Sequence, residues 1–153
     1  MIGYDAHKKV KGTKVHAAVT DNSLPVAIEI GSADQHEGRK LIPLMESICI
    51  HHQDGLRKKP KQVYADTKYD MPLNRFYLSD RRVQAQIPRR SKRVAGKRFN
   101  EFEYKRHRSS VERFFSWLKE GFRRMGFRYE RIPSAYLGFI RIACLIIHWR
   151  VLR

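Results

Sequence analysis

The stretch RSSVERFFSWLKEGFRRM, residues 108–125, decides how the chain folds, because its apolar residues recur at the spacing of a helix. At about 100° per residue, one side of that helix carries an apolar stripe, made of Val111, Phe114, Phe115, Leu118 and Phe122. Arg108, Glu112 and Lys119 fall within about 40° of one another on a separate face. The pattern predicts a helix that packs with one face and presents charges on the next.

Working outward from this helix, the sequence predicts a mixed α/β fold. The helix itself extends over residues 102–125, a break follows at Gly126, and a final helix begins near Ser134. Upstream, the patterns predict a β-hairpin at residues 14–30 with its turn at 21–23, a helix within 32–50, a strand at 62–65, a helix at 70–81 and a strand at 83–87. We expect one domain over residues 1–153, with a mobile basic loop, PRRSKRVAGKR, at residues 88–98.

The charge balance indicates a polyanionic partner. The chain has 32 Lys and Arg against 15 Asp and Glu, a formal net charge of +17. Such a surplus attracts a phosphate backbone without regard to sequence. A structural protein that binds RNA would share this composition, so the motifs have to identify the function.

The chemistry of the cysteines and of the apolar segments indicates a cytoplasmic protein. Cys49 and Cys144 lie among apolar residues, which predicts two buried thiols in a reducing compartment. The N-terminus has no apolar leader. The most apolar segment, residues 136–152, is interrupted by Arg141, His148 and Arg150, which favours a core helix and no membrane partner.

Asp66 is a candidate ligand for a metal ion, because it follows directly on the strand predicted at residues 62–65. The end of a strand in an open α/β sheet is a usual position for functional groups. Hard divalent cations take oxygen ligands held on separate rigid elements. The alternative is that Asp66 only caps the turn before Lys68.

Glu112 is the second candidate, on the charged face of the helix at residues 102–125. Arg108, one turn earlier, and Lys119 share that face. The alternative is an ordinary helix ion pair between Arg108 and Glu112, which contributes a few tenths of a kcal/mol.

The spacing Arg108-x3-Glu112-x6-Lys119 resembles part of the Tyr-x2-Arg-x3-Glu-x6-Lys signature of insertion-sequence DDE transposases. The chain departs from the signature at its tyrosine, since Lys105 stands there and Tyr104 comes one residue early. The string VYADTKYD at residues 63–70 resembles the family's second-carboxylate strand. The strings GYDAHKKVKGTKVHAAV and LPVAIEIG resemble its early hairpin, so the resemblance covers nearly the whole chain.

This resemblance implies a ribonuclease H-like mixed sheet flanked by helices, with two C-terminal helices and with the first strand missing. It implies that Asp66 and Glu112 hold Mg²⁺ or Mn²⁺ while Arg108 and Lys119 contact phosphate or the carboxylates. The first carboxylate of the family lies on the opening strand, for which an N-terminally truncated chain has no room. Asp5 is the only acidic residue before the hairpin and a poor substitute, because nothing apolar precedes it to form a strand.

Two functions remain open at this point. The first is DNA transposition by metal-dependent strand cleavage and strand transfer at transposon ends, impaired because the first carboxylate is absent. The second is a non-catalytic module that binds nucleic acid without sequence preference. The resemblance further implies DNA as the partner, at transposon ends and target, a homodimer or larger assembly on that DNA, and a place at the nucleoid.

Overall fold

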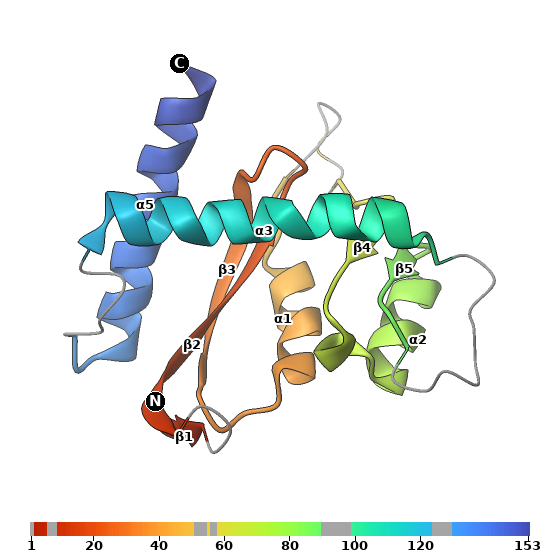
Figure 1. Cartoon of the computed structure of the whole chain (residues 1–153), viewed down its shortest axis with the longest axis horizontal. Coiled ribbons are helices and arrows are strands. Elements are labelled where there is room, and N and C mark those ends of the chain that lie inside the picture. Colours follow the sequence, from red (N-terminus) through yellow and green to blue (C-terminus); the bar gives the residue numbers. More distant parts are fainter. Residues whose placement is uncertain (1, 6–8, 51–54, 56–57, 90–98, 124–129) are drawn as a thin grey trace. The chain divides into compact units, whose positions relative to one another are not determined.

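The computed structural model describes residues 2–5, 9–50, 55, 58–89, 99–123 and 130–153. The chain forms two compact units. The first unit comprises Met1–Gln35 and Ser110–Arg153, and the second comprises His36–Ser109. Helices and two small sheets occur together, which confirms the mixed α/β class (Figure 1).

The first unit contains a three-stranded antiparallel sheet of β1 (Gly3–Asp5), β2 (Val10–Val19) and β3 (Pro25–Ser32). The predicted hairpin is confirmed, and β2 begins four residues before the predicted start at residue 14. In the turn, the amide of Ser23 donates to the carbonyl of Thr20 over 2.9 Å, and Ser23 has a φ of 64°.

Asp5 lies on a strand, contrary to the prediction that nothing there would form one. The backbone of β1 pairs with the start of β2, with Gly3 opposite Gly12 and Asp5 opposite Val10. The prediction failed because it required apolar residues, whereas a short strand on a sheet edge needs only backbone partners.

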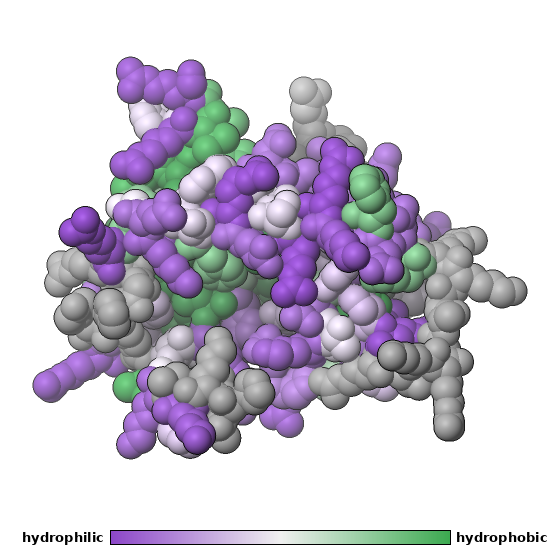
Figure 2. Space-filling view, in the orientation of Figure 1, coloured by the Kyte–Doolittle hydropathy of each residue, from purple (hydrophilic) through white to green (hydrophobic). Residues whose placement is uncertain are grey.

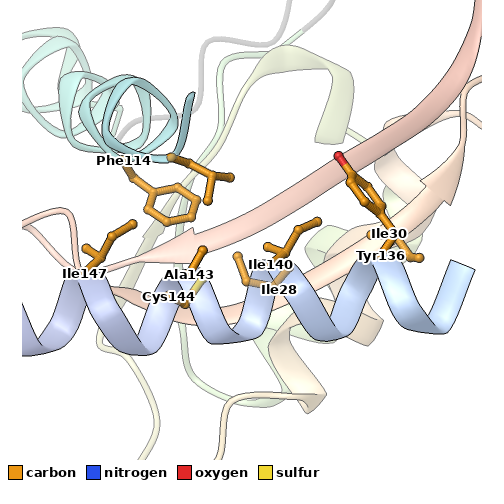
Figure 3. Close-up of a cluster of buried hydrophobic side chains, with 9 residues drawn as sticks. Ile28, Ile30, Phe114, Tyr136, Ile140, Ala143, Cys144 and Ile147 are labelled. Carbon is orange, nitrogen blue, oxygen red and sulfur yellow. The ribbon is translucent and has the colours of Figure 1, made fainter. Parts of the chain in front are cut away.

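The core of the first unit lies between the sheet, α3 (Glu101–Gly121) and α5 (Pro133–Leu152). Phe114 and Ile140 are fully buried, and Phe114 points from α3 toward α5 (Figure 3). The predicted stripe is therefore confirmed at Phe114 and at Leu118, which is 4% exposed. Figure 1 shows α5 beside β3, against which it packs.

The final helix was predicted as a core helix, and one of its faces confirms this. Tyr136, Ala143, Cys144 and Ile147 join Ile140 in the core. By length and composition alone α5 could also cross a membrane, a test that core helices of soluble proteins pass as well. Its opposite face is exposed.

The second unit contains β4 (Gln62–Tyr64) and β5 (Gln84–Gln86), which pair in parallel. α2 (Pro72–Asp80) connects them, with Pro72 at its first turn as predicted. Leu78 of α2 is fully buried in a small core together with Leu41, Val83 and Ile87.

Helix formation within residues 32–50 is shorter than predicted. It consists of a 3₁₀ turn, η1 (Glu37–Lys40), and α1 (Leu41–Glu46). The apolar residues Leu41 and Leu44 are buried as expected, but Ser47 already ends the helix. Cys49 therefore lies beyond the packed turn and is exposed, so the prediction of two buried thiols is wrong for Cys49 and right for Cys144. The loop predicted at residues 88–98 is outside the described residues from 90 onward, as is the break at Gly126.

Candidate functional site

Asp66 follows β4, at the point where the chain leaves the two-stranded sheet of the second unit. It is the N-cap of the 3₁₀ turn η2 (Thr67–Tyr69), and its Oδ1 accepts from the amide of Lys68 at 3.4 Å. That distance is longer than an ordinary hydrogen bond, so the cap is weak. The capping alternative is thus real in the structure, but it contributes little free energy at this length.

Tyr104, on the first turn of α3, links Asp66 to Arg108. Burial raises the pKa of Tyr104, the negative charge of Asp66 raises it further, and Arg108 lowers it by its charge and by a hydrogen bond. The guanidinium N–H donates and the phenol oxygen accepts. Tyr104 is therefore hydrogen-bonded to Arg108, and the charge of Asp66 also acts on its hydroxyl.

His107 attaches the start of α3 to β4. Its ring stacks on that of Tyr64, with the ring centroids 4.1 Å apart and the planes at 27°. The His107 Nε2 lies 3.2 Å from Oε2 of Glu103, one turn earlier on α3. Because Tyr64 is two residues before Asp66, this stack fixes the helix that carries Arg108 beside the strand end that carries Asp66.

The turn under Asp66 is braced by a buried amide. Asn74 is 2% exposed, and its Nδ2 donates to the carbonyl of Gly38 at 2.8 Å and to that of Tyr69 at 3.0 Å. A Cβ on Gly38 would lie 2.9 Å from the Lys68 carbonyl, so only glycine allows this approach. Lys68 also forms a 2.8 Å ion pair with Glu37.

Burial raises the pKa of Tyr69 strongly, with further contributions from the charges of Glu37 and Asp66. The second unit therefore gathers the negative charges of Glu37 and Asp66 near one buried phenol.

Glu112 and Lys119 lie in the first unit, on exposed positions of α3. The helix is held there by buried Phe114 and Leu118 and by Ser110, whose Oγ donates to the carbonyl of Asp21 at 2.9 Å. Glu112 comes one turn after Arg108 on the same helix, and Lys119 two turns later. The predicted charged face of α3 is therefore exposed, as a face that meets a ligand must be.

Of the predicted site residues, Asp66 and Arg108 both belong to the second unit, and the charge of each acts on the Tyr104 hydroxyl. Glu112 and Lys119 belong to the first unit, and Asp5 is placed by its backbone on β1. In the described part of the chain, no three His, Cys, Asp or Glu side chains form a group that could hold a metal ion. The assignment of Asp66 and Glu112 as metal ligands stays a prediction.

Sequence reasoning missed His107 and Asn74 and doubted Tyr104. The signal for Tyr104 was its spacing, since a residue four positions before Arg108 lies beneath it on a helix. Asn74 gave no signal, because a buried amide in a short helix looks like any polar residue.

The chain is similar to proteins of insertion sequences. A family model described as "Transposase DDE domain" matches residues 2–147. The chain is 32% identical over 147 residues to "Putative transposase for insertion sequence element IS402" of Burkholderia cepacia, covering 93% of this chain and 65% of that protein. It is 33% identical over 139 residues to "Putative transposase for insertion sequence element IS6501" of Brucella ovis, covering 90% of this chain and 98% of that protein.

A third relative, "Transposase for insertion sequence element IS1106" of Neisseria meningitidis serogroup B, is 30% identical over 133 residues, or 86% of this chain and 42% of that protein. The chain thus spans just under two thirds of the IS402 relative and less than half of the IS1106 relative. No solved structure matches the chain.

Proposed function

Because the chain belongs to the transposase DDE domain family, we propose that it is the catalytic domain of an insertion-sequence transposase that acts on DNA. The observation that carries this proposal is the placement of Asp66 at a strand end, where its charge acts on Tyr104. Tyr104 is hydrogen-bonded to Arg108, and both belong to the helix that also bears Glu112. We propose further that the α/β fold is ribonuclease H-like, although its strands form an antiparallel and a parallel sheet where a single mixed sheet was predicted.

Asp66 and Glu112 are the residues that would hold a divalent cation, Mg²⁺ or Mn²⁺. Both are exposed carboxylates on separate rigid elements, and their oxygen atoms are the ligand type that hard cations prefer. Two carboxylates fit part of a metal site. When bound, the ion would supply charge stabilisation for a phosphoryl transfer at a phosphodiester.

Arg108 and Lys119 would bind the DNA backbone on either side of Glu112. A guanidinium forks onto two phosphate oxygens, and an ammonium acts as a point charge. Tyr104 would orient Arg108 through their hydrogen bond, so that the guanidinium stays beside Asp66. In transposition these groups would position a DNA strand for cleavage and then its 3′-hydroxyl for attack on target DNA.

We propose that this chain cleaves DNA poorly. The described residues contain no third carboxylate grouped with Asp66 or with Glu112. In-line phosphoryl transfer with two ions needs a ligand shared between them. A cytoplasmic location at the nucleoid agrees with the net charge of +17.

Nicking of supercoiled plasmid DNA in Mg²⁺ or Mn²⁺ tests the assignment. We expect slow nicking that Asp66→Asn and Glu112→Gln each reduce by at least about 100-fold, the upper range for groups that only support a metal ligand. Glu120→Gln is the matched control, because Glu120 is exposed on the same helix and accepts from Ser116 at 2.7 Å. Equal nicking by Asp66→Asn and wild type would refute the site, whereas fast wild-type nicking lost in both variants would refute only the impairment.

A non-catalytic nucleic-acid-binding module is the second candidate, favoured by the exposed basic positions Lys105, Arg106, Arg113 and Lys119 of α3. The two candidates differ in cleavage and share salt dependence. Affinity for duplex DNA should fall steeply with salt, and a variant that lacks one phosphate-binding side chain should show a slope of log K against log salt that is smaller by about 1. An affinity independent of salt would contradict both.

A further inference from the structure

α5 is apolar on two opposite faces, and within the described part of the chain only one of them is covered. Its buried face packs in the core of the first unit. The other face exposes Ile142 at 55%, Leu145 at 70%, Trp149 at 70% and Leu152 at 74% of their surfaces. In Figure 2, apolar side chains gather over this C-terminal helix. Exposed apolar surface of this extent usually marks an interaction site.

Six residues of this face follow a heptad pattern, five of them exposed and Gly138 partly buried. Spacings of three and four alternate through six positions, Ala135, Gly138, Ile142, Leu145, Trp149 and Leu152, here named the α5 seam. This is the repeat by which one helix packs along another with interlocking side chains. The spacing therefore fits a second helix as the occupant.

Side-chain size changes along the α5 seam from small to large. Ala135 and Gly138 are at its beginning, and space is open where a Cβ of Gly138 would be. Trp149 and Leu152 are at its end. A complementary partner must have large side chains where the seam has small ones, and small side chains where the seam has large ones. A second copy of the seam that runs in the opposite direction meets this requirement.

We propose that the α5 seam is a two-fold interface between two copies of this chain, with the two helices antiparallel. Antiparallel pairing sets Ala135 against Leu152 and Gly138 against Trp149, in both directions, because a two-fold axis makes each pair occur twice. At the centre, Ile142 of each copy meets Leu145 of the other. The proposal does not depend on the proposed function.

The area available is at the lower limit for a specific pair. The four large seam residues and neighbouring Phe139, which is 47% exposed, offer at most about 500 Å² per copy if a buried aliphatic side chain contributes on the order of 100 Å² and an aromatic one about 200 to 250 Å². Two copies bury up to about 1,000 Å², the least area expected of a biological interface.

A hollow of about 430 Å³ beside the seam is explained by the same arrangement. It is lined by Leu145, His148, Trp149, Leu152 and Arg153. In the antiparallel register, Phe139 of the second copy lies opposite His148 and enters this hollow.

A parallel pair in the same register would be poorer in packing and in charge. It would set Trp149 against Trp149 and leave a void between the two Gly138 residues. α5 contains Arg141 and Arg150 and no acidic residue, so parallel helices would also align like charges.

Sedimentation velocity of the full chain over a concentration series tests the interface, with a charge swap that depends on the register. Ile142→Glu alone and Leu145→Lys alone should each weaken self-association by at least about 100-fold, because a charge is buried without a partner in both halves. The double variant should recover most of it, since antiparallel pairing sets the new acid against the new base, whereas parallel pairing sets like against like.

Phe76→Glu is the matched control, because Phe76 is 71% exposed on α2 and apart from the seam. It should leave self-association unchanged. Circular dichroism establishes that each variant keeps its helices. A wild-type chain that stays monomeric, a self-association that Ile142→Glu does not weaken, or a double variant no better than the single ones would each overturn the proposal. Binding of α5 to neutral phosphatidylcholine vesicles without self-association would overturn it in favour of a membrane face.

Discussion

Asn74→Asp replaces one buried atom without changing the shape of the side chain. Among such changes in the described part of the second unit, we expect it to be the most destabilising. The Nδ2 of Asn74 donates two hydrogen bonds, to the carbonyls of Gly38 and Tyr69, at 2.8 and 3.0 Å. Asn74→Asp puts a carboxylate oxygen where that donor was, facing the same two carbonyl oxygens. The side chain is 2% exposed, so water cannot take the place of the missing donor.

The magnitude follows from the two bonds and from burial. Removing each hydrogen bond to a buried carbonyl costs about 1 to 1.5 kcal/mol, and the repulsion and desolvation of the new carboxylate add at least about 1 to 2 kcal/mol. The expected loss is about 3 to 5 kcal/mol, a large fraction of the roughly 5 to 15 kcal/mol typical of a folded domain. Asp66 caps the turn that Tyr69 ends, so the strand end that bears Asp66 should loosen as well.

Urea unfolding followed by far-ultraviolet circular dichroism measures this loss. Asn22→Asp is the control, because it makes the same chemical change at an exposed position and should shift the free energy of unfolding by less than about 0.5 kcal/mol. Both tryptophans, Trp117 and Trp149, are in the first unit, so their fluorescence reports that unit separately. If Asn74→Asp unfolds at the urea concentration of the control, the amide is not buried between two carbonyls and the reasoning fails.

Three further outcomes are expected. Ser23→Gly should stabilise the chain by about 1 kcal/mol and raise Tm by about 2 to 4 °C, because Ser23 has a φ of 64° and its buried Oγ has no hydrogen-bond partner among the described residues. Ser23→Ala keeps the strained φ and should raise Tm by less. An unchanged Tm for Ser23→Gly would contradict the strain. A maleimide at pH 8 should label Cys49 quickly and Cys144 only after unfolding, since burial raises the pKa of Cys144 to about 11 and leaves about one thiolate in a thousand. Mass spectrometry of the labelled peptides measures this, and labelling of Cys144 in the native chain would contradict it. Tyr64→Ala should lower the free energy of unfolding in urea by about 2 kcal/mol, because it removes the ring that stacks on His107. Tyr64→Phe preserves the stack and should lower that free energy by less than about 0.5 kcal/mol. Equal losses of stability in the two variants would mean that the stack contributes nothing.

The helices and strands were largely predictable because each leaves a local signal. The period of the apolar stripe located α3, Pro72 marked the first turn of α2, and the turn residues at 21–23 located the hairpin. The errors arose where the sequence pattern alone does not decide. β1 forms because β2 offers backbone partners, and Cys49 is exposed because Ser47 ends α1 early.

The residues of the candidate site come from the sequence and stay a prediction, whereas the interactions that support them could not be predicted. A strand end and a helix face with signature spacing pointed to Asp66 and Glu112. The supports join residues far apart in the sequence, since Tyr64 of β4 stacks on His107 of α3, and Asn74 donates to Gly38, 36 positions before it. Such interactions become visible only once β4, η2 and the start of α3 have been placed within one unit.

The departure at the signature tyrosine illustrates how the fold resolves a sequence ambiguity. On a helix, the residue three positions before Arg108 lies about 60° from it, and the residue four positions before it lies about 40° away. A tyrosine at either position is therefore on the same side of the helix as Arg108. Tyr104 therefore needs no register shift to reach Arg108, and the hydrogen bond between them shows that it does. Lys105, at the signature position, instead pairs with Glu101 over 3.0 Å on the exposed side. The phenol is thus hydrogen-bonded to Arg108 and feels the charge of Asp66, although the signature position itself is occupied by Lys105.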